Sequence, residues 1–252
     1  MKKFQKEFEV HYYEVDFYQE LTPLALLNFL EETAIAHSEA VGYGVTRLKE
    51  KGYGWVLSQW QIEMDQYPHY GEKVKIQTWP SHFQRFYGDR EFLVLNSQDK
   101  VIARASSLWI FLNLEKRRPT RIPQEVSDAY HIFPDKALSF PFPELKMSQT
   151  REKKRSKFMI RRSDIDTNDH VNNAKYIEWV LETIPEEVYR TYRISSLEVV
   201  YKKESTYGQM IQSVTEEQQR VDQEAHYVHQ ILERDGEEEV ALALAQTRWS
   251  KR

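Results

Sequence analysis

The feature that most constrains the fold of this chain is an internal repeat with an offset of 150 residues. Val15-Asp16 aligns with Ile165-Asp166, and without a gap Glu32 then falls on Glu182. A Tyr-Gly pair marks the same later turn in both halves at a slightly different offset. Repeats of this kind indicate a duplicated structural unit that packs on its own copy.

Hydrophobic periodicity predicts the same order of elements in both halves, a strand, a long helix and then four strands. In the first half we expect a helix at Leu24–Val41 and strands at Phe4–Val15, Trp55–Asp65, Lys73–Trp79, Phe86–Asn96 and Val101–Leu114. In the second half we expect a helix at Asn173–Ile184 and strands at Phe158–Arg162, Ser196–Glu204, Met210–Glu216, Ala225–Arg234 and Val240–Trp249, with a hairpin turn at Asp235-Gly236.

A helix wrapped by an antiparallel sheet leaves a sheet edge and one helix flank in need of a partner. Two such units in one chain can each pair with the sheet edge and cover the helix flank of the other. We therefore predict an α+β protein with a continuous antiparallel sheet around two helices. The first unit should span residues 1–116 and the second residues 158–252. Residues 117–157 contain five prolines and end in a basic run, which is typical of an interdomain linker.

Composition excludes several classes of protein. The chain has 252 residues, 40% of them hydrophobic, which is typical of a globular protein with a sizeable core. With a formal net charge of -4, the chain has no overall positive potential that would attract nucleic acid or an anionic membrane. No apolar run has the length of a membrane span. The chain has no cysteine and no signal-peptide pattern at its N-terminus, so we expect a cytoplasmic protein.

Polar side chains gather in the turn that precedes the second helix, and only there. Asn168, Asp169, His170, Asn172 and Asn173 stand where the first copy has Tyr18, Gln19, Glu20, Thr22 and Pro23, and Glu204 stands where it has Tyr67. A strand that breaks into such a turn gathers reactive groups at a helix N-terminus, where free N–H groups favour negative charge. The second turn is therefore the candidate active site.

Other interpretations of this turn fit less well. Asp164, Asp166 and Asn168 match the first positions of a calcium loop, but Asp169 replaces its glycine and Lys175 its final glutamate. A zinc site would rest on one histidine and nearby carboxylates. For Asp164 and Asp169, we expect helix capping and no catalytic role. We expect neither a metal nor a cofactor.

At this point the chain resembles the acyl-acyl-carrier-protein thioesterases of plants and bacteria, over nearly its whole length. The resemblance is carried by Asp166-Thr167-Asn168-Asp169-His170-Val171-Asn172-Asn173, by Tyr176-Ile177-Glu178-Trp179 and by Leu197-Glu198-Val199-Val200-Tyr201-Lys202-Lys203-Glu204. It implies a double hotdog fold, two tandem units that each wrap an antiparallel sheet around a long helix. It also implies hydrolysis of a fatty acyl thioester on acyl carrier protein.

The resemblance places the catalytic positions at Asp166, Asn168, His170 and Glu204. The family often has a cysteine after that glutamate, whereas this chain has Ser205. A cysteine nucleophile is therefore excluded, and a serine would need its own base and an orienting group. Water is the simpler nucleophile.

Thioester hydrolysis needs an activated water and donors for the oxyanion. His170 can act as the base near neutral pH, and Asn168 can hold the water or the carbonyl. Asp166 or Glu204 can orient His170 or polarise water directly, and the sequence does not decide between them. Backbone N–H groups from Val171 to Asn173 are candidates for the oxyanion hole.

Other residues are expected to bind substrate. These are Leu24, Leu27, Leu30, Trp55 and Trp60 along the acyl chain, and Asn172 and Asn173 at the thioester. Core and tunnel walls need the same residue types, so sequence does not separate the two roles.

The expected partner is an acyl carrier protein, and such proteins are acidic. Arg117-Arg118, Arg121, the run Arg151 to Lys157 and Lys202-Lys203 are candidates for a local basic patch. A homodimer is a further candidate assembly. The alternative functions are an acyl-coenzyme A thioesterase of the same fold and a non-catalytic acyl-binding module.

Overall fold

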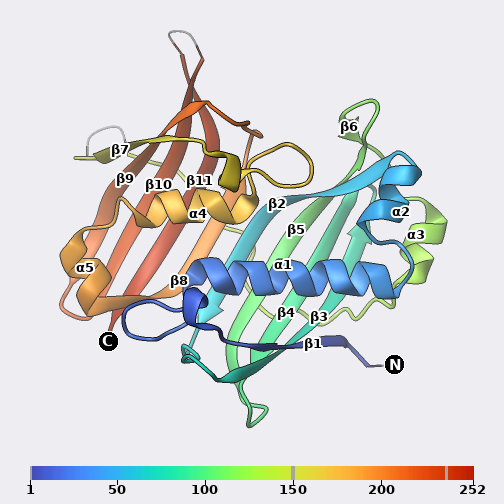
Figure 1. Cartoon of the computed structure of the whole chain (residues 1–252), viewed down its shortest axis with the longest axis horizontal. Coiled ribbons are helices and arrows are strands. Elements are labelled where there is room, and N and C mark those ends of the chain that lie inside the picture. Colours follow the sequence, from blue (N-terminus) through green and yellow to red (C-terminus); the bar gives the residue numbers. More distant parts are fainter. Residues whose placement is uncertain (1, 149–150, 236–237) are drawn as a thin grey trace. The chain divides into compact units, whose positions relative to one another are not determined.

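The computed structural model describes residues 2–148, 151–235 and 238–252. The chain forms two compact units, Met1–Pro141 and Phe142–Arg252 (Figure 1). The boundary lies inside the range 117–157 that sequence marks as a linker. No helix among the described residues is long and apolar enough to cross a membrane.

The first unit is an antiparallel sheet with one long helix lying across it (Figure 1). The strands follow the spatial order β1-β3-β4-β5-β2, and a short β6 pairs with β5. Their bounds are β1 Phe4–Glu9, β2 Tyr53–Met64, β3 Lys73–Gln84, β4 Tyr87–Leu95, β5 Val101–Asn113 and β6 Arg118–Pro119. The helices are α1 Pro23–Ala40, α2 Val45–Glu50 and α3 Gln124–Ala129.

Helix α1 begins where the sequence predicts it. The Thr22 hydroxyl accepts the Ala25 N–H at 3.2 Å, and Pro23 occupies the first helical position, where a missing N–H costs nothing. Leu27, Leu30 and Ala34 recur at helical spacing and are buried against the sheet.

The second unit repeats this arrangement with a shorter helix. Its strands follow the order β7-β9-β10-β11-β8, which matches β1-β3-β4-β5-β2 strand for strand. Their bounds are β7 Lys154–Met159, β8 Tyr192–Tyr201, β9 Met210–Val221, β10 Glu224–Asp235 and β11 Glu238–Lys251. The helices are α4 Asn173–Leu181 and α5 Glu186–Thr191. The prediction of two units that each wrap a helix in an antiparallel sheet is confirmed.

Several predicted bounds were wrong, and the reasons are local. The first strand ends at Glu9, because residues Tyr12–Glu14 form a 3-10 helix, η1. The strand before the second turn runs over Lys154–Met159, not Phe158–Arg162, since Arg162–Asp164 forms the matching 3-10 helix η2. The predicted turn at Asp235-Gly236 lies partly outside the described residues.

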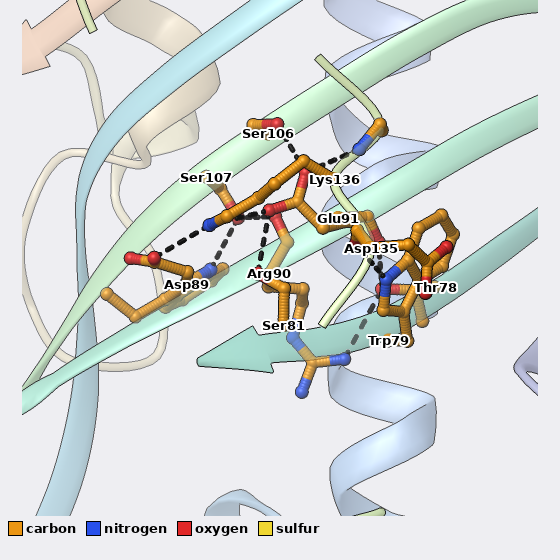
Figure 2. Close-up of polar contacts among 12 residues, drawn as sticks. Thr78, Trp79, Ser81, Asp89, Arg90, Glu91, Ser106, Ser107, Asp135 and Lys136 are labelled. Carbon is orange, nitrogen blue, oxygen red and sulfur yellow. Dashed lines mark hydrogen bonds and ion pairs between the residues drawn. The ribbon is translucent and has the colours of Figure 1, made fainter. Parts of the chain in front are cut away.

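Part of the predicted linker is bound to the first unit by a buried carboxylate. Glu91 of β4 is fully buried and accepts hydrogen bonds from Ser81 and Ser106 and from the Ala137 N–H at 3.0 Å. Lys136 Nζ lies 3.2 Å from the same carboxylate (Figure 2). These bonds compensate the burial of the charge, so residues 135–137 follow the surface of the sheet.

Candidate active site

The turn before α4 and the turn before α1 have the same backbone. Asp166 N–H donates to His170 O at 2.8 Å, and Asp16 N–H donates to Glu20 O at 2.9 Å. The residue at the tip of each turn has a positive φ, 65° for Asp169 and 63° for Gln19. The offset of 150 predicted from sequence therefore holds at the level of single hydrogen bonds.

Asp166 serves this backbone in the same way as its counterpart. Its Oδ1 accepts the N–H of Asn168 at 2.7 Å and of His170 at 3.4 Å. Asp16 Oδ1 accepts the N–H groups of residues 18 and 20, at 2.8 and 3.1 Å. Because the first copy keeps this aspartate without the polar set, holding the turn is a role that Asp166 has apart from any chemistry.

The structure brings the Glu204 carboxylate to the imidazole ring of His170. His170 Nε2 and Glu204 Oε2 are 3.3 Å apart. The side chains are 26% and 46% exposed, so both can meet a substrate from solution. The two segments that carry the pair are also joined by a backbone hydrogen bond, in which the Val171 N–H donates to Ser205 O at 2.9 Å.

Two of the other polar residues of the turn, Asn172 and Asn173, make hydrogen bonds at the start of α4. Asn172 caps α4, since its Oδ1 accepts the Ala174 N–H at 2.8 Å. The Asn173 carbonyl accepts the Tyr201 hydroxyl at 3.0 Å. Asn168 is exposed at the edge of the turn.

Asp164 caps a different element from the one expected. It is fully buried, and its carboxylate accepts the Arg161 N–H at 2.7 Å and the Arg161 guanidinium. Burial alone would raise the pKa of Asp164, but the hydrogen bonds from Arg161 hold it below its usual value. The residue thus closes η2, while Asn172 caps α4. Across the described ranges, no group of three His, Asp or Glu side chains could hold a metal ion.

Ser205 follows Glu204 in the chain, but its hydroxyl is hydrogen-bonded within its own segment. It is 2% exposed, and its hydroxyl donates to Gln209 Oε1 at 2.6 Å. An amide oxygen cannot take a proton as a general base, so this contact does not activate the hydroxyl as a nucleophile.

The predicted acyl-chain residues lie in the core of the first unit, in two places. Leu27, Leu30 and Trp60 are fully buried, Trp60 with its ring 5.1 Å from that of Phe92. Leu24 and Trp55 are half-buried. Trp55 packs instead against the cluster of Leu48, Phe111, Ile122, Val126 and Tyr130.

A tandem pair of helix-in-sheet units, with a histidine and a carboxylate at the start of one helix, defines a class of hotdog proteins. Within this class, the chain belongs to the acyl-ACP thioesterase family. The profile of the acyl-ACP thioesterase N-terminal domain matches residues 1–130, and that of the C-terminal domain matches residues 147–251.

Named relatives agree with this assignment. The chain is 30% identical over 228 residues to a chloroplastic oleoyl-acyl carrier protein thioesterase of Coriandrum sativum. It is 32% identical over 224 residues to a chloroplastic palmitoyl-acyl carrier protein thioesterase of Gossypium hirsutum. Each alignment covers 84% of this chain, but only 62% and 54% of those proteins. The chain thus spans less than two thirds of these relatives.

Solved structures have the same fold. The crystal structure of an acyl-ACP thioesterase from Bacteroides thetaiotaomicron superimposes with a TM-score of 0.82 at 30% identity, covering 98% of this chain and 97% of that one. The 12:0-ACP thioesterase from Umbellularia californica superimposes with a TM-score of 0.87 at 24% identity, covering 99% and 94%. The double hotdog fold predicted from sequence is thereby confirmed.

Proposed function

We propose that this protein hydrolyses the thioester of fatty acyl chains carried on acyl carrier protein and releases free fatty acid. The observation that carries the proposal is the His170–Glu204 pair, 3.3 Å apart at the start of α4, in a chain of the acyl-ACP thioesterase family. The curated relatives named above are an oleoyl- and a palmitoyl-acyl carrier protein thioesterase, which supports a fatty acyl substrate on acyl carrier protein.

Glu204 orients His170 in the proposed reaction, and His170 takes the proton from the attacking water. Water then adds to the thioester carbonyl. The Val171 and Asn172 N–H groups are used by Ser205 O and Asp164 O, so the Asn173 N–H is the proposed oxyanion donor, with Asn168 holding the water or the carbonyl. Collapse of this intermediate breaks the C–S bond. The imidazolium returns its proton to the leaving thiolate. Asp166 supports this arrangement by holding the turn.

The acyl chain is proposed to lie along the first unit, beside Leu24, Leu27, Leu30 and Trp60. At the thioester, the proposed main-chain donor is the Asn173 N–H, because the Asn172 side chain caps α4 and the Asn172 N–H donates to Asp164 O at 2.9 Å. The contacts of Trp55 with Phe111 and Phe83 make a role in this tunnel less direct.

Carrier recognition is proposed for the exposed lysines that precede Glu204. Lys202 and Lys203 are both exposed, and Lys203 Nζ lies 3.3 Å from Glu233 Oε2. Exposed cations beside the pair would attract an acidic carrier protein. A homodimer and a cytoplasmic location remain predictions, and the curated relatives named above are chloroplastic.

The test is hydrolysis of one acyl chain on two carriers, acyl carrier protein and coenzyme A. We expect turnover on acyl carrier protein with a higher kcat/KM than on coenzyme A. His170→Ala should lower kcat by about 10²–10⁴-fold, the usual contribution of a positioned base. The control is Glu20→Ala, which changes the matching position of the first turn and should cost little.

Two results would contradict the proposal. If the protein hydrolysed the thioester on neither acyl carrier protein nor coenzyme A, an acyl-binding module would be left as the function. Equal losses in His170→Ala and Glu20→Ala, at unchanged thermal stability, would show that the second turn is not the active site.

A further inference from the structure

Tyr176 is a buried residue of α4 that the proposed chemistry does not use. Helical side chains tilt toward the helix N-terminus, so its ring lies back toward the turn that bears His170. The residue is 2% exposed. Its ring is held edge-to-face by Trp179 at 5.5 Å and by Tyr201 at 5.7 Å between centroids. The position of its hydroxyl is therefore fixed by packing.

The hydroxyl of Tyr176 is buried beside the candidate site. Within the described residues it makes no hydrogen bond of ordinary length and angle. Burial raises the pKa of Tyr176, the charge of Glu204 raises it further, and the nearby Ser205 N–H has a smaller, opposite effect. The phenol thus stays protonated at neutral pH, close to the Glu204–Ser205 segment. A buried polar group placed there by the fold calls for a function, because leaving it unsatisfied is costly.

The first copy of the repeat shows what this place looks like without the site. Tyr176 corresponds to Leu26 at the offset of 150 residues. Ser205 corresponds to Pro68, because the carbonyls of these two residues accept the equivalent N–H groups of Val171 and Leu21. The first copy therefore lacks both the hydroxyl of Tyr176 and the N–H of Ser205, since leucine has no hydroxyl and proline has no N–H. Hydroxyl and N–H occur together, and only in the copy that carries the His170–Glu204 pair.

We propose that Tyr176 is a positioning residue, whose hydroxyl holds the Glu204–Ser205 peptide and thereby keeps the Glu204 carboxylate against His170. In this proposal the Ser205 N–H donates to the phenolic oxygen, and the phenolic O–H donates to the Glu204 carboxylate. This inference rests on the proposed function, because His170 and Glu204 are the reacting pair in it. Tyr176 itself is not placed on the substrate.

The test compares Tyr176→Phe with Tyr227→Phe. The first variant keeps the ring and removes only the hydroxyl. The control removes another buried phenolic hydroxyl of the same unit, one that donates to Glu217 at 2.9 Å away from the turn. We expect kcat of Tyr176→Phe on acyl carrier protein thioesters to fall by about 5- to 10-fold, the equivalent of one hydrogen bond, with KM unchanged. Tyr227→Phe should keep the wild-type kcat.

A second readout needs no substrate, so it separates this inference from the proposed function. The ring resonances of His170 are recorded by NMR in the wild type and both variants. They should shift and broaden in Tyr176→Phe and stay in place in Tyr227→Phe. If the wild-type protein hydrolysed no thioester, the proposed function would fail, while these spectra would still decide whether Tyr176 positions the pair.

A double variant covers the case in which the hydroxyl only supports folding. Tyr176→Leu with Ser205→Pro installs the pair found in the first copy. It should recover most of the thermal stability lost in Tyr176→Leu alone, yet keep a low kcat. Wild-type kcat and His170 resonances in Tyr176→Phe, or a kcat that returns with stability in the double variant, would overturn the inference.

Discussion

At the scale of single residues, Ser205 is the position that distinguishes two mechanisms, one with water as the nucleophile and one with a covalent acyl-serine intermediate. Its hydroxyl is buried and donates to Gln209, which also accepts the Thr206 N–H at 2.7 Å. We expect Ser205→Ala to keep kcat within a few-fold of the wild type. The cost should appear in stability instead, at about 1 kcal/mol for one buried hydrogen bond. Steady-state kinetics and thermal melts measure the two effects. A loss of about 10³-fold or more in a folded variant would instead indicate a nucleophile at this position.

Sequence identified the residues of the turn but not all of their roles. The polar set was visible because it stands in one of two aligned copies. The part played by Asp166 depends on which N–H groups its carboxylate accepts, and that of Asn172 on where α4 begins. Tyr176 was missed because an aromatic residue at helical spacing is usually part of the core. Tyr176 stands where the first copy has Leu26, and this difference between the copies is the signal that could have identified Tyr176.

At the scale of elements, the two long helices differ in what they offer to a substrate. Helix α1 has 18 residues and α4 has 9. Helix α1 begins without the polar set, and Leu27 and Leu30 are fully buried on it. In the proposed function its apolar face shapes the acyl site. Leu27→Trp or Leu30→Trp should therefore shift the preference toward shorter chains by filling volume, as measured by kcat/KM over a series of acyl lengths.

The control for this prediction is an exposed position of the same helix. Ile35→Trp changes a residue that is 39% exposed and should leave the chain-length profile unchanged. Large side chains in a packed core also cost about 1–3 kcal/mol, so each variant must first be shown to fold. A wild-type profile in folded Leu27→Trp and Leu30→Trp would assign these leucines to the core alone.

The long elements could be predicted because each has a periodic pattern and a start signal, as Thr22-Pro23 has for α1. The second helix was predicted to reach Ile184, but it ends at Leu181 and α5 begins after Pro185. The 3-10 helices η1 and η2 were missed because three residues show no period. The carboxylate of Glu91 was missed as well, since its partners lie on β3, β5 and the segment after α3, far apart in sequence.

At the scale of the whole molecule, each unit contains a histidine that is buried in its neutral form. In the first unit, burial and the nearby Arg90 lower the pKa of His37 to about 3. Arg90 Nη1 donates to His37 Nδ1 at 2.9 Å, so protonation of that nitrogen would break the bond. In the second unit, burial and His226 lower the pKa of His229 to about 3. Its ring nitrogens contact the hydroxyls of Thr215 and Thr247 at 2.7 and 2.9 Å.

These two histidines should make both units sensitive to mild acid. An unfolded histidine has a pKa near 6.5, so between about pH 6.5 and pH 3 the unfolded chain binds more protons than the folded one. The stability is complete above pH 6.5 and falls as the pH falls, by about 1.4 kcal/mol per pH unit for each histidine. At pH 5 the loss is about 2 kcal/mol each, which is large against a typical total of about 5–15 kcal/mol.

Urea unfolding at pH 7 and pH 5 tests this prediction. The variants are His37→Gln, His229→Gln and, as a control, His82→Gln at an exposed position. The first two should be less stable than the wild type at pH 7, because their buried contacts change. Between pH 7 and pH 5, however, each should lose about 2 kcal/mol less than the wild type does. His82→Gln should follow the wild type at both pH values. If all four proteins lost the same free energy on acidification, carboxylate protonation elsewhere would account for the acid sensitivity, and the two buried histidines would have no part in it.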